Sequence, residues 1–194
     1  MSRSSIGRGV LVLLAIAGAL AVSIPAGAKA IARSTQEKRV ERGKRLVWSI
    51  GCNDCHTPKK LGAKGPELDT ERLLSGHRQG VTMPPAPPLP PGPWRIVVGA
   101  ELTAWSGPWG TTYAQNLTPD VHTGLGIWTE EMFLKALRTG KHMGVSRQIM
   151  PPMPWDVYGR LPDEDLKSIY AYLRTIKPIK NQVPDAVVAP PPQG

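Results

Sequence analysis

The sequence predicts an all-α fold in which three main helices are joined by long irregular segments. Three stretches carry helix signals in the form of apolar periodicity, capping residues and helix-ending residues. No segment alternates apolar and polar residues strongly enough for a sheet, and "WRIVVGAEL" (94–102) predicts at most a short strand or hairpin arm. The 21 Pro and 20 Gly among 194 residues indicate that much of the remaining chain is loop.

The first helix is predicted over 34–52. Ser34 and Glu37 form a capping box at its start. A rough apolar face follows, formed by Val40, Val47 and Ile50. Gly43 lies between these positions, and glycine inside a helix is costly unless another backbone approaches closely there. Gly43 therefore marks a predicted close helix contact, with a tolerated surface glycine as the alternative.

Two further helices are predicted in the second half of the chain. One covers 129–138, with Thr129 as its N-cap and Gly140 as its stop. The last covers 161–177, begins at Pro162 with three acidic residues in its first turn, and stops before Pro178. Its apolar positions follow i, i+3, i+4, i+7 spacing and are Leu166, Ile169, Tyr170 and Leu173.

The helices and their connections predict one domain over 34–180. Its long middle segment, about 59–115, is rich in proline and tryptophan. The run "MPPAPPLPPGP" (83–93) must be extended or polyproline II. Residues 181–194 are predicted to form a flexible, proline-rich C-terminal tail.

The N-terminal segment, 1–30, predicts export. Arg3 and Arg8 precede the apolar run "GVLVLLAIAGALAVSI" (9–24), and small-x-small patterns follow it. This arrangement is typical of a secretory signal peptide, and Pro25 and the small residues favour cleavage. The apolar stretch 9–28 is just long enough to span a bilayer, so an uncleaved inner-membrane anchor is the alternative. In either case we expect the body of the protein in the periplasm.

The chain is basic, with a formal net charge of +9. Such a charge can indicate nucleic-acid binding, but the basic residues are scattered and the sequence contains no recognisable nucleic-acid-binding motif. Docking on an acidic protein partner or on anionic lipid accounts for the charge equally well.

The most informative stretch is "GCNDCHTP" (51–58), which holds both cysteines of the chain. A disulfide between Cys52 and Cys55, as in thiol oxidoreductases, leaves His56 unexplained. A zinc site needs four ligands, normally from two such pairs, and there is no second pair. The C-x-x-C-H pattern instead signals covalent attachment of haem c. Each thiol would add to a porphyrin vinyl group, and His56 would be the proximal iron ligand. Two cysteines allow one covalent haem.

A methionine thioether is the predicted sixth ligand of the iron, because it saturates the iron and suits electron transfer. In "MPPMPW" (150–155), prolines on both sides of Met153 stiffen the loop before the last helix. Met153 is therefore the predicted ligand and Met150 is second, although packing is the commoner role of methionine. The weaker alternatives are Met83, Met143 and, for bis-histidine ligation, His77, His122 and His142, three residues expected in surface loops.

These motifs in this order resemble the class I cytochrome c family, and most closely its bacterial periplasmic members with one haem. The resemblance rests on "CHTP", "NLTPD…TG.G.WT", "PPMPW…Y" and "DEDLK…YAYLR", which stand at 55–58, 116–129, 151–158 and 163–174. It implies that Cys52 and Cys55 attach the haem and that His56 and Met153 are its axial ligands. It also implies that Gly43 and Val47 cross the last helix near Tyr172 and Leu173. Trp128, Tyr113 or Asn116 would contact a haem propionate, with core packing as the alternative role of Trp128.

Relative to compact members of that family, residues 59–115 form an insertion. Its tryptophans, Trp94, Trp105 and Trp109, would either cover the haem edge or form a binding arm, and we favour cover. The expected function is electron transfer in the periplasm, with acidic dehydrogenases, oxidases or reductases as partners and no catalysis of its own. A dedicated cytochrome subunit of a membrane-bound dehydrogenase or respiratory complex is the alternative. A haem enzyme or sensor with an open distal site would require a free sixth position.

Overall fold

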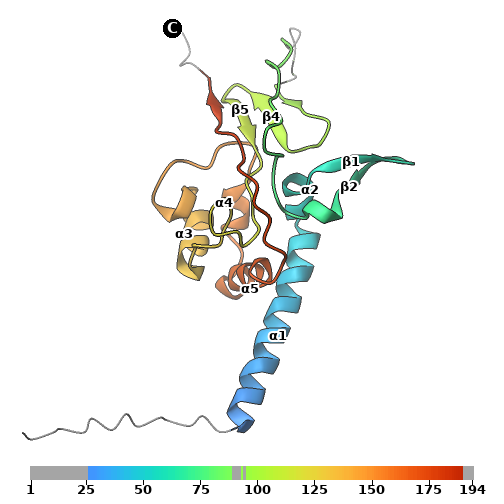
Figure 1. The fold of residues 1–194 in the computed structure, drawn as a ribbon. Coiled ribbons are helices and arrows are strands. Elements are labelled where there is room, and N and C mark those ends of the chain that lie inside the picture. The colour runs from blue at the N-terminus through green and yellow to red at the C-terminus, as the bar shows by residue number, and fades with distance from the viewer. Residues whose placement is uncertain (1–25, 89–92, 94, 190–194) are drawn as a thin grey trace, which may run out of the picture.

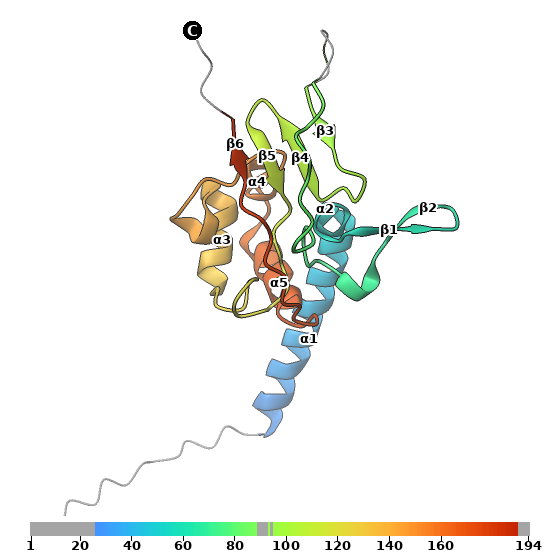
Figure 2. The ribbon, with the colours of Figure 1, turned by 45° about the horizontal axis from the view of Figure 1, so that its top comes forward.

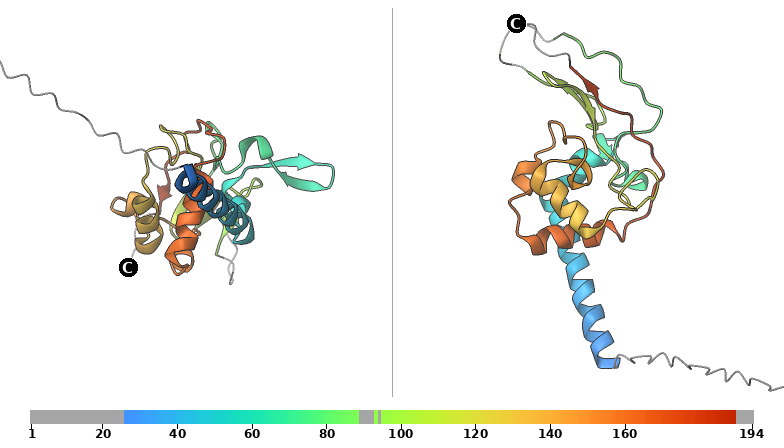
Figure 3. Two further views of the ribbon diagram at one scale, coloured as in Figure 1. Left: turned by 90° about the horizontal axis from the view of Figure 1, so that it is seen from below. Right: turned by 90° about the vertical axis from the view of Figure 1, so that its left-hand side faces the viewer.

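The structure is a computed structural model that describes residues 26–88, 93 and 95–189. Five α-helices form its framework: α1 (Ala26–Ser49), α2 (Cys52–His56), α3 (Glu130–Thr139), α4 (Trp155–Tyr158) and α5 (Asp163–Leu173). Short 3₁₀ turns add η1 (Thr70–Arg72) and η2 (His142–Gly144). Helix α5 packs against the C-terminal half of α1, and α3 packs against α5 and α4, while the N-terminal half of α1 projects from the body (Figures 1 and 3).

The predicted first helix is present, but it begins earlier than its capping box indicates. Ser34 lies inside α1, and the hydroxyl of the next residue, Thr35, donates to the carbonyl of Ile31 within the helix (3.0 Å). The Ala-rich run that begins at Ala26 has high helix propensity and extends the helix toward the N-terminus. At the other end, Gly51 adopts a left-handed conformation (φ 78°) and separates α1 from α2.

The crossing of α1 and α5 lies where Gly43 predicts a close contact. A Cβ at Gly43 would overlap the backbone carbonyl of Ser168, so only glycine allows this approach. Val47 and Leu173 are fully buried beside the crossing, and Tyr172 is buried with them. Arg42 of α1 also donates to the buried carboxylate of Asp165 in α5 (2.5 Å). The crossing residues that the resemblance implied therefore pack in one core.

The other two helices agree closely with their sequence signals. The Thr129 hydroxyl accepts from the Met132 amide (3.2 Å) at the start of α3, and Gly140 ends α3 with φ 67°. Helix α5 is shorter than the predicted 161–177, and Pro162 occupies its N-cap position. The apolar faces of α1, α3 and α5 meet in the main core, which contains Val47, Leu125, Phe133, Leu137, Leu166, Ile169, Tyr172 and Leu173.

The expectation of an all-α fold is corrected by two small antiparallel sheets. Strands β1 (Lys59–Gly62) and β2 (Gly65–Leu68) form a hairpin that points away from the body (Figure 2). The second sheet has the order β3-β4-β5-β6, built from β3 (Val97–Val98), β4 (Ala104–Gly107), β5 (Gly110–Tyr113) and β6 (Val187–Val188). These strands are two to four residues long, too short to show alternation. The pairs β1–β2, β3–β4 and β4–β5 join neighbouring segments, whereas β6 pairs with β5 from far along the chain.

The C-terminal segment also differs from the expected flexible tail over residues 181–189. Asn181 is fully buried, and its amide donates to the carbonyls of Ser75 and His77 (2.7 and 2.8 Å). Further along, β6 pairs with β5 at the edge of the sheet. The end of the chain is thus joined to the predicted insertion by hydrogen bonds that no local pattern shows. The rest of the predicted tail, 190–194, lies outside the described residues.

Most of the predicted signal or anchor also falls outside the described residues, which begin at Ala26. Within the part of the chain that the structure describes, no helix combines the length and the apolar character that a membrane crossing needs.

Candidate haem site

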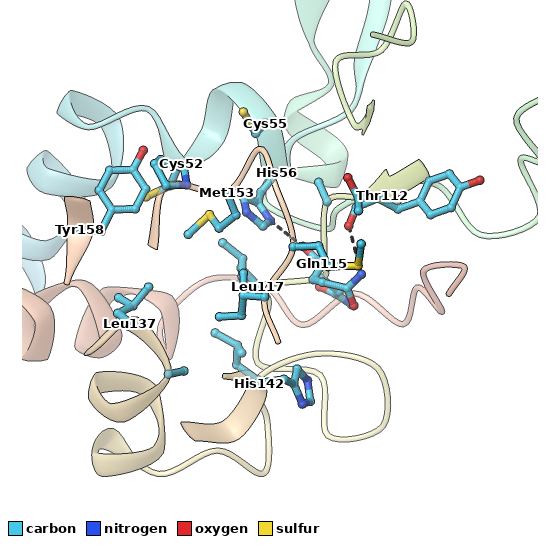
Figure 4. Close-up of a pocket in the computed structure, with 18 of the residues that line it drawn as sticks. Cys52, Cys55, His56, Thr112, Gln115, Leu117, Leu137, His142, Met153 and Tyr158 are labelled. Carbon is cyan, nitrogen blue, oxygen red and sulfur yellow. Dashed lines mark hydrogen bonds between the residues drawn. The ribbon is translucent and has the colours of Figure 1, made fainter. Parts of the chain in front are cut away.

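Helix α2 presents its two cysteines and its histidine to one cavity. Cys52 and Cys55 are one helical turn apart, both thiols are free, and both side chains line the cavity together with His56 (Figure 4). Burial raises the pKa of Cys52 to about 12, and it also raises the pKa of Cys55. A thiol oxidoreductase needs the opposite shift, because its attacking thiol must ionise near neutral pH. The environment therefore argues against that alternative.

The imidazole of His56 is oriented as a metal ligand would be. Its Nδ1 lies 2.7 Å from the carbonyl oxygen of Gln115, so Nδ1 carries the proton and donates, which leaves the Nε2 lone pair free (Figure 4). His56 is buried, and this burial lowers the pKa of the ring. A neutral imidazole with a free Nε2 is the form that coordinates iron.

The cavity suits a large apolar group. Its volume is about 230 Å³, whereas one water molecule needs only about 10–15 Å³. Apolar side chains from the loop before α3, from α3 itself and from α5 line it, among them Leu117, Leu125, Phe133, Leu137, Ile169 and Leu173. A planar porphyrin with apolar faces fits this lining, and the two thiols lie where its vinyl groups could be attached.

The predicted methionine loop lies on the same cavity. Of the four candidate methionines, all of them described, Met150 and Met153 line the cavity, whereas Met83 and Met143 do not. Figure 4 shows Cys52, His56 and Met153 turned toward the same space. The Thr112 hydroxyl donates to the Pro151 carbonyl of this loop (2.7 Å). Helix α4, which follows the loop, is tied to the end of α1 because the Tyr158 hydroxyl donates to the Ile50 carbonyl (2.9 Å).

The three alternative histidines have different environments. His77 is buried, contrary to the expectation of a surface loop, and both of its ring nitrogens are bonded, to Thr103 Oγ1 (2.8 Å) and to the Val81 carbonyl (3.0 Å). His122 is exposed, as expected. His142 is half-buried, lines the cavity and packs edge-on against Trp128 with ring centroids 5.0 Å apart. Burial and the nearby Arg147 lower the pKa of His142.

Trp128, Tyr113 and Asn116, for which the resemblance implies contact with a haem propionate, all line the cavity. That contact stays a prediction. The Asn116 amide is already committed, because its nitrogen donates to the Ile179 carbonyl (2.8 Å) and its oxygen accepts from Thr118 (2.8 Å). Sequence reasoning missed Gln115, Thr112 and Arg147. Each lies in a segment without a metal-ligand pattern, so only the packing of distant segments brings it to the site.

The insertion contributes to the site through its sheet. Trp105 and Thr112, which are paired across β4 and β5, line the cavity, and Ala186 joins them from the C-terminal segment. The β1–β2 hairpin contributes no lining residue, and neither does Trp109. Trp94 lies outside the described residues. The sheet therefore forms part of the cavity wall, whereas the hairpin contributes nothing to it.

A helical frame around an apolar cavity, with two thiols and an imidazole delivered by one turn of helix, defines a covalent haem carrier. The family comparison agrees, since the cytochrome c family model matches residues 40–177. The chain belongs to the cytochrome c family. This membership confirms the prediction of a c-type cytochrome whose function is electron transfer rather than catalysis.

Several curated proteins are similar to this chain. The fructose dehydrogenase cytochrome subunit of Gluconobacter japonicus is 46% identical over 157 residues, which cover 78% of this chain and 25% of that protein. The cytochrome c subunit of the quinone-dependent alcohol dehydrogenase of Gluconobacter oxydans is 40% identical over 81 residues, 40% of this chain and 17% of that protein. A diheme cytochrome c-type protein of Cereibacter sphaeroides is 27% identical over 178 residues, 92% of this chain and 50% of that protein. The chain thus spans at most about half the length of these relatives.

Proposed function

We propose that the chain transfers electrons through one covalently attached haem c, held by Cys52 and Cys55 and ligated by His56 and Met153. The observation that carries this proposal is that all four residues line one and the same apolar cavity. When bound, the haem would carry one electron at a time by alternating between ferric and ferrous iron. The chain contains one C-x-x-C-H motif and two cysteines, which supports one haem of the class I type rather than two.

The residues of the chain would orient the His56 ligand, exclude water and contact the polar groups of the haem. Gln115 holds the His56 ring in the tautomer that leaves Nε2 free. The apolar lining would keep water away from the haem iron. This would favour ferrous iron, the less charged of the two oxidation states, and would protect the weak bond between the iron and the Met153 thioether. The charge of Arg147 and the half-buried His142 offer a polar end of the cavity for the propionates.

For the place of the chain in the cell, we propose residues 1–30 as the export segment and 34–180 as the cytochrome domain. The periplasm is the proposed compartment, because covalent haem attachment and an N-terminal export signal agree with it. The proposed anchor, residues 9–28, would tie the domain to the inner membrane if it is not removed.

The names of the relatives favour the role of a dedicated subunit over that of a free carrier. Two of the three are cytochrome subunits of dehydrogenases that act on fructose or on alcohol. A dehydrogenase with an acidic docking surface is accordingly the proposed electron donor, and its substrate is a small sugar or alcohol.

A haem-stained native gel of mildly solubilised membranes and of the periplasmic fraction tests this role. Mass spectrometry then identifies the band that carries the chain. A large membrane band that contains a dehydrogenase would support the subunit. A small soluble haem band would show a free carrier with a cleaved signal.

A further inference from the structure

The Thr112 side chain makes a contact that the electron-transfer function alone does not require. Thr112 is buried in β5, and its hydroxyl donates to the carbonyl of Pro151 (2.7 Å; Figure 4). Pro151 is two residues before Met153, in the loop that would present the thioether. The Trp109 indole nitrogen in turn lies 3.4 Å from the Thr112 hydroxyl oxygen, which accepts from it. The Thr112 hydroxyl thus accepts a hydrogen bond from Trp109 and donates one to the methionine loop.

The same short segment also contacts the other proposed iron ligand, His56. Gln115, three residues after Thr112, accepts the hydrogen bond from Nδ1 of His56. An extended chain spans roughly 10 Å over three residues, so this short segment can contact two separate parts of the cavity wall. Residues 112–115 therefore contact both the histidine segment and the methionine loop.

This segment is itself firmly placed by the rest of the insertion. Thr112 is paired with Trp105 across β4 and β5. The Ala114 amide donates to the Thr103 carbonyl, and the Ala114 carbonyl accepts from the His77 amide, both at 2.8 Å. His77 is buried and bonded through both ring nitrogens, so the segment is fixed on its far side as well. Because residues 112–115 are held in place by these bonds, the hydrogen bond from Thr112 can restrain the methionine loop.

We propose that Thr112 is a positioning residue that holds the Met150–Pro154 loop so that the Met153 thioether stays on the iron. Through Thr112 and Gln115, residues 112–115 form hydrogen bonds with both segments that carry the proposed iron ligands. This proposal rests on the ligation of the haem iron by His56 and Met153 proposed above. It also gives the sheet of the insertion a function besides covering the cavity.

The test replaces the hydroxyl without changing the shape of the side chain. In Thr112→Val the hydrogen bond to Pro151 is lost, so the loop should release Met153 more readily. Imidazole added to the oxidised protein binds only when the thioether leaves, and its affinity should rise about 2- to 10-fold, the range that one net hydrogen bond gives. Thr112→Ser keeps the hydroxyl and should restore the wild-type affinity. If the valine variant does not fold, Thr112→Ala against Thr112→Ser repeats the comparison.

Thr111→Val is the matched control, because the Thr111 hydroxyl lies on the same strand and bonds to Ser106 (3.1 Å) rather than to the loop. A Thr112→Val protein whose imidazole affinity equals that of Thr111→Val would overturn the positioning role. Met153→Ala separates the two proposals. If it binds imidazole no more tightly than the wild type, Met153 is not the ligand and the proposed ligation fails; if it binds more tightly while Thr112→Val is unchanged, the positioning role alone fails.

Discussion

At the scale of single residues, the proposed chemistry depends on which methionine sulfur is the second ligand beside His56. Met150 and Met153 both line the cavity, and a proline follows each of them. The sequence pattern favours Met153, because Pro152 and Pro154 enclose it directly. Thr112 adds a constraint on this loop that can be seen only in the folded chain, since Thr112 and Pro151 are 39 positions apart.

Replacement of the proposed ligand should change the spectrum and the redox potential together. In Met153→Ala the far-red absorption of the thioether bound to ferric iron should disappear. The reduction potential should fall as well, because a thioether raises it. Absorption spectroscopy of the oxidised protein and a mediated redox titration measure the two effects.

Met150→Ala is the control, because Met150 shares the loop and the cavity lining. It should keep the far-red band. A band that survives in Met153→Ala and vanishes in Met150→Ala would transfer the assignment to Met150.

At the scale of elements, the crossing of α1 and α5 sets the position of the haem-attachment helix. Helix α2 follows α1 after the turn at Gly51, so a change in the α1–α5 distance is passed on to Cys52, Cys55 and His56. The closest approach in this crossing is at Gly43, against the Ser168 carbonyl.

Gly43→Ala should therefore destabilise the folded protein, although alanine favours helices. The added methyl group would force α1 and α5 apart, and overpacking of this kind costs about 1–3 kcal/mol of unfolding free energy. Denaturant unfolding followed by circular dichroism measures the loss.

Ser34→Ala provides the comparison within the same helix, since Ser34 is exposed on α1 and lies outside the proposed export segment. It should leave the unfolding free energy unchanged or slightly raised. Equal stability of the two variants would mean that α1 and α5 are not in close contact at Gly43.

The elements also show which parts of the fold a sequence can reveal. Helix α3 was predicted almost to the residue, because Thr129 and Gly140 are local capping signals that act within one turn. The start of α1 was predicted too late in the chain, because Ser34 and Glu37 match the capping-box pattern although they lie inside a helix that begins at Ala26. The sheets were missed because strands as short as Val97–Val98 cannot show alternation, and because Val187–Val188 pairs with a strand far back along the chain.

The same distinction holds for the site. Cys52, Cys55 and His56 could be proposed from the sequence because covalent attachment needs them at a fixed local spacing. Gln115, Thr112 and the buried environment of His77 could not, because each depends on contacts between distant segments. Asn181 is the extreme case: it reads as part of a polar tail, yet it is fully buried among Ser75, His77 and Arg72.

At the scale of the whole molecule, the charge and the hairpin suggest where a partner docks. The β1–β2 hairpin begins three residues after His56, projects from the body and carries the exposed Lys60 and Lys64 (Figure 2). Cys55, close to it in the chain, is also exposed. The formal net charge of +9 would add long-range attraction to an acidic donor.

Electron transfer with such a donor should slow as ionic strength rises, because salt screens exposed charges. Lys60→Glu combined with Lys64→Glu should lower the second-order rate about 10-fold at low salt, and the difference should vanish at high salt. Stopped-flow reduction by the dehydrogenase identified on the native gel measures these rates.

Lys38→Glu combined with Lys44→Glu, at two exposed positions of α1, is the charge-matched control and should have a much smaller effect. If this α1 variant slows the reaction as much as the hairpin variant does, only the net charge matters and the hairpin has no particular part in docking.

The most direct test of the central claim is the intact mass of the exported chain, measured under denaturing conditions after expression with the cytochrome c maturation system. The proposal predicts a mass increased by one haem, and fragments that carry it on the peptide containing Cys52 and Cys55. An unmodified chain, or one lighter by two hydrogens because Cys52 and Cys55 form a disulfide, would contradict covalent haem attachment and with it the proposed route of electron transfer.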